Sequence, residues 1–250
     1  MKNRLRDVWA EGKAGFNGWL SIPNTFTAEI SGMQDFDSLV IDLQHGLVEY
    51  QTALTMLQAL SGSTATPMAR VPWLEPGIIM KMLDAGAMGI ICPMVNTPED
   101  AEAFVGACRY APLGYRSSGP TRAGMVQENY HAEANEQIIS LAMAETVEAL
   151  ENIELIVKTP GLTGIYIGPS DLAISLGHGP GLDRTEPDVV AAIDRILEAC
   201  KSAGIIAGLH CGTPAYAKQM IAKGFRFVTL ASDVRILTAG VAAIIAEARS

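Results

Sequence analysis

Eight short apolar runs recur along the chain, each followed by a longer segment whose apolar residues return with the period of a helix. This alternation is typical of repeated strand and helix units around a mostly parallel sheet. Eight such units in one α/β domain predict a closed (β/α)8 TIM barrel. The predicted strands span 15–20, 38–42, 67–71, 89–93, 139–144, 164–168, 205–209 and 226–230.

The length of 250 residues suits one barrel, so we expect a single domain, 1–250. The competing fold is an open, doubly wound sheet, but no G-x-G-x-x-G motif follows the first strand. Two stretches without helical period, 111–129 and 178–186, are expected to be lids, substrate loops or subunit contacts. The predicted helices span 48–60, 76–85, 98–108, 146–158, 187–203, 213–223 and 232–248.

Charge argues against two classes of partner. The 18 basic and 27 acidic residues give a formal net charge of −9, which repels nucleic acids and anionic membranes. The 49% of apolar residues is enough for a large packed core. The first residues lack the apolar run of a secretion signal, and the most apolar stretch, 77–95, is interrupted by Lys81 and Asp84. The four cysteines form no C-x-x-C pair, so we expect reduced thiols and a cytoplasmic location.

Polar residues stand where several predicted strands end, which is where barrel enzymes carry their chemistry. Glu145 follows the fifth strand and Asp171 follows the sixth. Two neighbouring carboxylates repel one another unless a cation lies between them, and oxygen ligands suit Mg²⁺, Mn²⁺ or Co²⁺. We therefore predict that Glu145 and Asp171 are metal ligands. The alternative is that both complement the dipoles of the helices that follow.

Three further residues are candidates for the chemistry. Arg70 ends an apolar strand and should meet an anion, either a substrate or a structural carboxylate. His45 follows the second strand, where a general base is needed. Asp84 could orient His45 or face solvent. Of the other histidines, His210 ends the seventh strand and is placed to line the pocket.

The segment Gly168, Pro169 and Ser170 opens the helix after the sixth strand, and the free backbone N–H groups there are a natural seat for a substrate carboxylate. Every lysine falls on a predicted helix, a helix end or the N-terminal tail, so a Schiff-base mechanism is disfavoured. No Walker A loop, G-x-S-x-G or H-E-x-x-H motif occurs, and nothing indicates an organic cofactor.

Several motifs taken together resemble those of the HpcH/HpaI aldolase family. The resemblance covers nearly the whole chain. The motifs are Phe36-Asp37, Asp42-x-x-His45-Gly46, Arg70, Leu83-Asp84-Ala85-Gly86, Pro93-Met94-Val95, Arg109-Tyr110-x-Pro112-x-Gly114-x-Arg116, Glu145-Thr146 and Gly164 to Leu172 with its Gly-Pro-Ser-Asp core. Gln44 and Met143 depart from the pattern of many relatives.

The resemblance implies a barrel of the phosphoenolpyruvate/pyruvate type that assembles as a homo-hexamer, a trimer of dimers, with the last helix exchanged between subunits. It also implies metal-dependent, class II cleavage of 4-hydroxy-2-oxoacids to pyruvate, or hydroxypyruvate, and an aldehyde. By the same resemblance, Glu145 and Asp171 are the metal ligands, Arg70 stabilises the enolate, His45 is the base and Asp84 its partner. The residues that bind the substrate carboxylate are Gly168, Pro169 and Ser170.

Two alternatives remain open on the sequence. A lyase acting on coenzyme A thioesters would need a basic pocket, and the loop 109–122 carries Arg109, Arg116 and Arg122. A non-catalytic barrel is the other alternative, because Met143 removes a polar substrate contact that relatives have.

Overall fold

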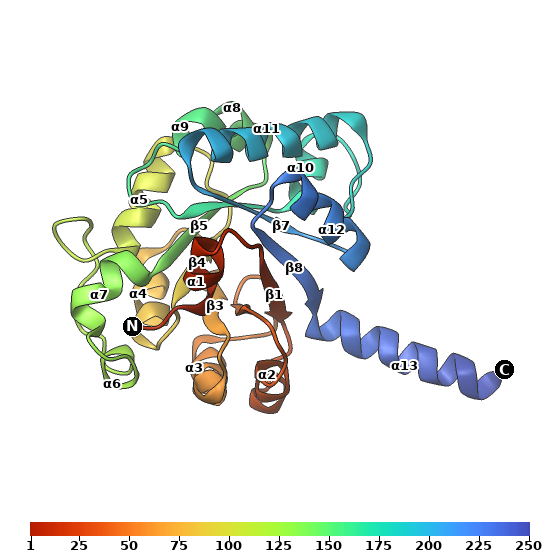
Figure 1. The fold of residues 1–250 in the computed structure, drawn as a ribbon, viewed down its shortest axis with the longest axis horizontal. Coiled ribbons are helices and arrows are strands. Elements are labelled where there is room, and N and C mark those ends of the chain that lie inside the picture. The colour runs from red at the N-terminus through yellow and green to blue at the C-terminus, as the bar shows by residue number, and fades with distance from the viewer.

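The computed structural model describes the chain from Met1 to Ser250. Eight parallel strands close into a barrel in chain order, with β8 pairing with β1 (Figure 1). Every predicted strand overlaps an observed one, which confirms the predicted (β/α)8 fold. The strands are β1 (Gly15–Leu20), β2 (Ser38–Asp42), β3 (Thr66–Arg70), β4 (Gly89–Cys92), β5 (Ile139–Ala144), β6 (Gly164–Ile167), β7 (Ile206–His210) and β8 (Phe227–Ser232).

The helices begin and end at residues suited to those positions. Thr97 and Asp100 form a capping box at the start of α5, and Gly204 ends α11 in the left-handed conformation that glycine tolerates best. The helices are α1 (Arg4–Ala10), α2 (Thr25–Gly32), α3 (Tyr50–Ala59), α4 (Pro76–Asp84), α5 (Pro98–Cys108), α6 (Ala123–Val126), α7 (Tyr130–Gln137), α8 (Val147–Glu151), α9 (Ile153–Ile156), α10 (Pro169–Ser175), α11 (Pro187–Ala203), α12 (Pro214–Lys223) and α13 (Asp233–Arg249).

The predicted helix 146–158 is wrong as a single element. Asn152 leaves the helical conformation between α8 and α9, and its side-chain amide donates a 3.0 Å hydrogen bond to the carbonyl of Asn96. An Asn that bonds to a backbone carbonyl in this way competes with the helix. Three other helices, α1, α2 and α7, were not expected, and α6 lies inside the stretch predicted to be irregular. The helix expected to open at Gly168, Pro169 and Ser170 is α10.

Side chains fill the inside of the barrel, so it is a packed core and not a pore. A second, larger core lies between the strands and the surrounding helices. The interior core residues are Leu5, Trp19, Val40, Met68, Ile91, Ile139, Leu141, Met143, Tyr166 and Phe227.

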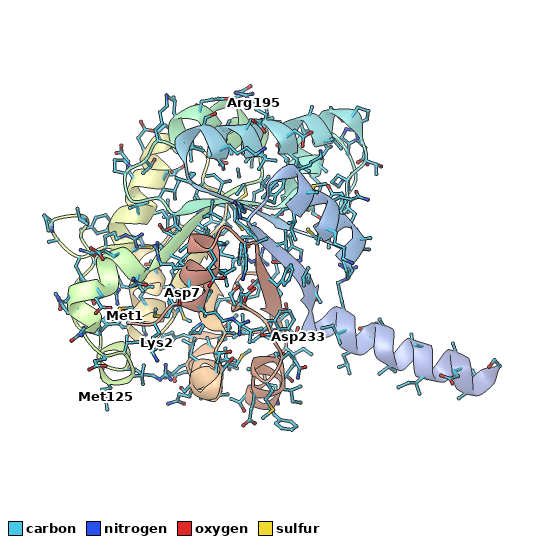
Figure 2. The ribbon with its side chains drawn as sticks, in the orientation of Figure 1. Met1, Lys2, Asp7, Met125, Arg195 and Asp233 are labelled. Atoms are coloured by element: carbon cyan, nitrogen blue, oxygen red, sulfur yellow. The ribbon has the colours of Figure 1, made fainter.

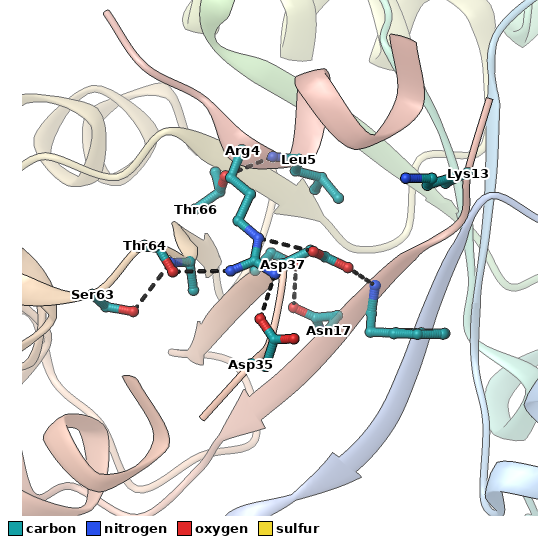
Figure 3. A network of polar contacts seen from close by, with 12 residues as sticks. Arg4, Leu5, Lys13, Asn17, Asp35, Asp37, Ser63, Thr64 and Thr66 are labelled. Carbon is teal, nitrogen blue, oxygen red and sulfur yellow. Dashed lines mark hydrogen bonds and ion pairs between the residues drawn. The ribbon is translucent and has the colours of Figure 1, made fainter. Parts of the chain in front are cut away.

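Helix α1 closes the amino end of the barrel. Leu5 inserts into the interior core, while Arg4 binds Asp37, with Nε 2.9 Å from Oδ1, and also Asp35, with Nη2 2.6 Å from Oδ1 (Figure 3). The other oxygen of Asp37 accepts the Phe16 N–H at 2.8 Å. These contacts tie the N-terminal segment to β1 and to the start of β2.

Helix α13 projects from the barrel (Figure 1). Asp233, at its base (Figure 2), accepts the N–H groups of Ser21 and Ile22 at 3.0 Å each and so fixes the first turn to the end of β1. Beyond that turn the helix is exposed on every side. Its uncovered apolar side chains are Val234, Ile236, Leu237, Val241, Ile244 and Ile245. None of the helices in this chain combines the length and apolarity needed to cross a bilayer.

Candidate active site

The carboxyl end of the barrel gathers the polar residues that the sequence singled out. Asp42 and Arg70 are the last residues of β2 and β3, and strand register sets them side by side. Glu145 follows β5, and Asp171 lies in the first turn of α10, just after β6. Parallel strands deliver their carboxyl ends to one face, so these groups share the mouth of the barrel.

Arg70 binds Asp42 through two parallel hydrogen bonds. Nε lies 2.8 Å from Oδ1 and Nη2 lies 2.6 Å from Oδ2. Burial alone would raise the pKa of Asp42, but the hydrogen bonds and charge of Arg70 outweigh it and lower the pKa. Trp19 donates its indole N–H to Asp42 at 3.1 Å and lies under the guanidinium at 4.8 Å. The structural carboxylate partner considered for Arg70 is therefore Asp42.

One part of the guanidinium stays free. Arg70 Nη1 makes no hydrogen bond within the chain, because Asp42 occupies only Nε and Nη2. Asp42 thus fixes the orientation of Arg70 while leaving Nη1 to donate to another oxygen. A donor held in place before the reaction is what stabilisation of an oxyanion requires.

Glu145 is buried, with 2% of its surface exposed. Its Oε1 accepts the backbone N–H of Met94 at 2.8 Å, and its Oε2 has no partner in the chain. Burial raises the pKa of Glu145 to about 7; the Met94 hydrogen bond lowers it, and the nearby charge of Asp171 raises it further. The charge of Arg70 lowers it, but Arg70 is paired with Asp42, and Glu145 has no ion-pair partner of its own. Burial of its charged form is therefore costly.

The backbone of Met94 binds the Glu145 carboxylate, and the missing side chain at Gly168 makes room for it. Met94 has φ of 54°, a left-handed conformation that costs a residue with a side chain about 1–2 kcal/mol, and this conformation accompanies the N–H bond to Oε1. A side chain at Gly168 would collide with Oε2. Gly168 is therefore required so that the carboxylate can occupy its position.

The helix-dipole alternative does not account for Glu145. Thr146 is the N-cap of α8, and its hydroxyl accepts the Ala149 N–H at 3.0 Å, so Glu145 is not the capping residue. Asp171 is exposed in the first turn of α10, where the dipole and a bound cation would both favour a carboxylate. No cluster of three or more His, Cys, Asp and Glu side chains suited to a metal occurs, and a metal bound by Glu145 and Asp171 would have only these two protein ligands.

The start of α10 differs in detail from the prediction. Pro169 has no N–H, so it cannot donate to a substrate carboxylate. The N–H groups of Ser170 and Asp171 have no acceptor in the chain. The Ser170 hydroxyl is already engaged, because it donates to the Gly181 carbonyl at 3.1 Å and accepts the Gly181 N–H at 3.0 Å.

His45 and Asp84 do not meet within one chain. His45 is exposed at the mouth, and its imidazole makes no hydrogen bond to the protein. Helix α4 runs back from the end of β3, so its last residue, Asp84, lies at the amino end of the barrel. There it pairs with Arg116, 2.6 Å from Nη2. The predicted orientation of His45 by Asp84 is thus absent from the single chain.

The three loop arginines do not form a basic pocket. Arg109 is buried and donates to the Ser140 hydroxyl and the Gly161 carbonyl. Arg116 is buried against Asp84 and Tyr130, and Arg122 donates to the carbonyls of Ala85 and Leu57. These contacts remove the observation that favoured a coenzyme A thioester as substrate.

Cavity volume does not mark the site. A cavity of 620 Å³ lies at the amino end, between Arg6 and Arg109, far from the carboxylates. The carboxylates and hydrogen-bond donors described above lie at the carboxyl end instead. The role of the Met94 N–H could not be predicted, because a positive φ at a residue other than glycine has no sequence signature. Trp19 was likewise not expected to support Asp42.

Comparisons with known proteins agree with this arrangement. The HpcH/HpaI aldolase/citrate lyase family model matches residues 17–239. A hydroxypyruvate/pyruvate aldolase of Rhizorhabdus wittichii is 43% identical over 249 residues, 99% of each chain. A 4-hydroxy-2-oxo-heptane-1,7-dioate aldolase of Salmonella heidelberg is 33% identical over 251 residues, 99% of this chain and 95% of that one.

A solved structure gives the same result at the level of the fold. The crystal structure of an HpcH/HpaI aldolase/citrate lyase family protein from Burkholderia cenocepacia J2315 has a TM-score of 0.93 and 31% identity, with 100% of both chains covered. The resemblance seen in the sequence motifs is confirmed. The chain belongs to the HpcH/HpaI aldolase/citrate lyase family and is a carbon–carbon lyase of the aldolase type.

Proposed function

We propose that this protein is a divalent-metal-dependent aldolase that reversibly cleaves 4-hydroxy-2-oxoacids to an aldehyde and either pyruvate or hydroxypyruvate. The observation that carries the proposal is the buried Glu145 carboxylate, whose free Oε2 lies at the mouth of the barrel together with Asp171. The names of the two relatives support the donor molecules, since one is a hydroxypyruvate/pyruvate aldolase and the other acts on a 4-hydroxy-2-oxoacid.

The donor set fits a hard cation. Glu145 and Asp171 offer only oxygen atoms, Glu145 forms no ion pair within the chain, and Gly168 leaves room beside Oε2. Glu145 and Asp171 would hold Mg²⁺, Mn²⁺ or Co²⁺. Bound there, the ion supplies a positive charge that stabilises the enolate of a 2-oxoacid. No organic cofactor is needed for this chemistry.

The other residues have complementary roles in the proposed mechanism. The N–H groups of Ser170 and Asp171, at Gly168-Pro169, bind the substrate carboxylate, and Arg70 Nη1 donates to the enolate oxygen. His45 removes the proton from the C4 hydroxyl. The C3–C4 bond then breaks, its electrons move onto the enolate oxygen, and the aldehyde leaves; protonation at C3 completes pyruvate.

We propose that the chain works as a homo-oligomer, with α13 exchanged between subunits and a hexamer, a trimer of dimers, as its form. The apolar residues of α13 have no cover in one chain, and exposed apolar surface of this size marks an interface. A contact between His45 and Asp84 would then have to join two copies. The Asp84 side chain, 28% exposed beside Arg116, is open to such a contact.

The proposed location is the cytoplasm, which suits four buried, unpaired cysteines. The proposed partners are small molecules, a 2-oxoacid and an aldehyde. Nucleic acids and membranes are not proposed as partners, because the formal net charge is −9.

Exchange of the C3 protons of pyruvate tests the proposed function without knowledge of the aldehyde. The protein is incubated with pyruvate in D₂O with Mn²⁺, Mg²⁺ or Co²⁺, and loss of the methyl signal is followed by NMR. We expect exchange that stops when EDTA is added. Exchange that is unchanged by EDTA would contradict metal dependence, and no exchange with any metal would contradict the proposed chemistry.

A further inference from the structure

A chain of buried polar groups runs from the mouth of the barrel into its interior, and the proposed mechanism does not use it. His210 Nδ1 lies 3.0 Å from the Tyr166 hydroxyl, which lies 2.6 Å from the Thr229 hydroxyl. Asn17 Nδ2 donates to Thr229 at 2.9 Å, and the Ser38 hydroxyl donates to Asn17 Oδ1 at 2.8 Å. The last four groups are fully buried.

The direction of these hydrogen bonds follows from counting donors. Thr229 accepts from Asn17, so its own hydroxyl proton still needs an acceptor. The Tyr166 oxygen is the acceptor available to it in the chain. A buried donor left without an acceptor is costly, so Thr229 donates to Tyr166. Tyr166 must then donate its own proton to His210 Nδ1, which leaves His210 neutral with its proton on Nε2.

The surroundings of His210 also favour the neutral ring. Burial lowers the pKa of His210 to about 4, with Arg70 and Arg235 lowering it further and Asp42 raising it. These charged groups face the ring from β3, α13 and β2. The imidazole also packs against Trp19 in a T-shaped arrangement, with ring centroids 5.0 Å apart.

Trp19 contacts His210 as well as the Arg70–Asp42 pair at the mouth of the barrel. The same indole lies under the Arg70 guanidinium and donates to Asp42. His210 Nε2 has no partner in the chain, and the residue is half-buried at the end of β7. A neutral N–H donor is suited to an uncharged oxygen, whereas Arg70 and the N–H groups of α10 are suited to charged ones.

We infer that Tyr166 fixes His210 as the Nε2–H tautomer, and that this N–H binds an uncharged hydroxyl oxygen of the substrate, favouring hydroxylated over unsubstituted substrates. Hydroxypyruvate, with a hydroxyl at C3, and glycolaldehyde, a hydroxylated acceptor, are the two sources of that oxygen. The substrate part of this inference rests on the proposed aldolase function, whereas the tautomer does not. Tyr166 is a positioning residue, since it acts through His210.

Solid-state ¹⁵N NMR of histidine-labelled protein tests the tautomer at any oligomer size. The chain has four histidines, and the signals lost in His210→Phe identify His210. At pH 7 we expect His210 to have an unprotonated Nδ1 and a protonated Nε2. In Tyr166→Phe, we expect this pattern to become a mixture of tautomers. A protonated Nδ1 in the unmodified protein would overturn the inference, and so would an unchanged pattern in Tyr166→Phe.

Kinetics test the substrate contact. The ratio of kcat/KM for hydroxypyruvate to that for pyruvate, and for glycolaldehyde to that for acetaldehyde, is measured in each variant. We expect at least one ratio to fall about 3- to 10-fold in His210→Phe and in Tyr166→Phe, the loss of one neutral hydrogen bond. His178→Gln, at a half-buried histidine paired with Asp188 in a loop away from the site, is the matched control and should change neither ratio.

The outcomes separate the two proposals. If both ratios stay unchanged in active His210→Phe and Tyr166→Phe, the substrate contact is wrong. If His210→Phe does not fold, Tyr166→Phe alone decides, because it retains the imidazole. If the unmodified protein has no aldolase activity with any of these substrates, the proposed function and the substrate contact both fail, while the NMR result still decides the tautomer.

Discussion

The two ends of the barrel differ in whether every acid has an ion-pair partner within the chain. At the amino end, Asp37 is paired with Arg4 and Asp84 with Arg116 (Figure 3 shows the first pair). At the carboxyl end, Asp42 is paired with Arg70, but Glu145 is buried with one backbone N–H as its hydrogen-bond partner, and the charge of Asp171 raises its pKa. The amino end therefore pairs both of these acids within the chain, whereas the carboxyl end leaves Glu145 without an ion-pair partner.

This difference indicates that the mouth of the barrel lowers the stability of the fold. Uncompensated burial of Glu145 and the left-handed Met94 both cost free energy of folding, and both occur at the mouth. Strain and unpaired charge collect at functional sites, where they prepare the protein for a ligand. The amino end, in contrast, is organised for stability, as expected for that face of a barrel.

The largest effect is expected when the unpaired acid is removed. Glu145→Gln keeps the shape of the side chain but loses the charge, so we expect Mn²⁺ binding to be lost and kcat to fall about 10³-fold or more. Calorimetry with Mn²⁺ and steady-state kinetics measure the two effects. Glu148→Gln, an exposed glutamate three residues along, is the control and should behave like the unmodified protein. Full activity in Glu145→Gln would mean that the unpaired acid at the carboxyl end has no role in function, and would contradict the comparison of the two ends.

The next largest effect concerns Arg70, the cation already paired at the mouth. Arg70→Lys keeps the charge but loses the two parallel bonds to Asp42 and the free Nη1 donor. We expect kcat to fall about 10²- to 10³-fold. A change confined to KM, with kcat unaltered, would mean that Arg70 binds the substrate without stabilising its enolate.

The pH dependence of stability sharpens the comparison. Because the folded protein raises the pKa of Glu145 from 4.5 to about 7, it binds more protons than the unfolded chain between these values. Stability of the EDTA-treated protein should therefore fall as pH rises from about 4.5 to about 7, by up to about 3 kcal/mol from this group. The free energy of unfolding is measured by denaturant at several pH values for the unmodified protein and for Glu145→Gln. The difference between the two at each pH is the contribution of Glu145. A difference that does not vary with pH would show that Glu145 titrates normally.

The smallest effect is expected at the amino end. Asp37→Asn weakens the bonds from Arg4 and the Phe16 N–H, so we expect the free energy of unfolding to fall by about 1–3 kcal/mol. Affinity for Mn²⁺ should not change. Urea denaturation and calorimetry check the two statements, with Asp35→Asn, at a largely exposed acid, as the control. Reduced metal affinity in Asp37→Asn would mean that the two ends are coupled.

Sequence patterns were sufficient for the barrel because strands buried on both faces must be apolar runs. The run at 139–144, for instance, coincides with β5. They were not sufficient at Asn152, where a side-chain bond to Asn96 interrupts a segment of helical period. The short helix α2 was missed because it depends on the Asn24 cap more than on an apolar stripe.

The candidate site was predictable where it depends on topology. Glu145 and Asp171 follow neighbouring strands, so their shared location could be derived. Within one chain Asp84 does not meet His45, because a helix after a strand runs back toward the amino end and carries its last residue away from the mouth. The burial of Arg109 and Arg116, and the backbone of Met94, depend on packing that no local pattern encodes.

The most direct test of the account is a crystal soaked with Mn²⁺ and pyruvate, examined at the manganese absorption edge. The account predicts an anomalous peak within coordination distance, about 2.0–2.3 Å, of carboxylate oxygens of both Glu145 and Asp171, with Arg70 Nη1 near the pyruvate oxygen. A peak elsewhere, or none at these two carboxylates while pyruvate is bound, would contradict it.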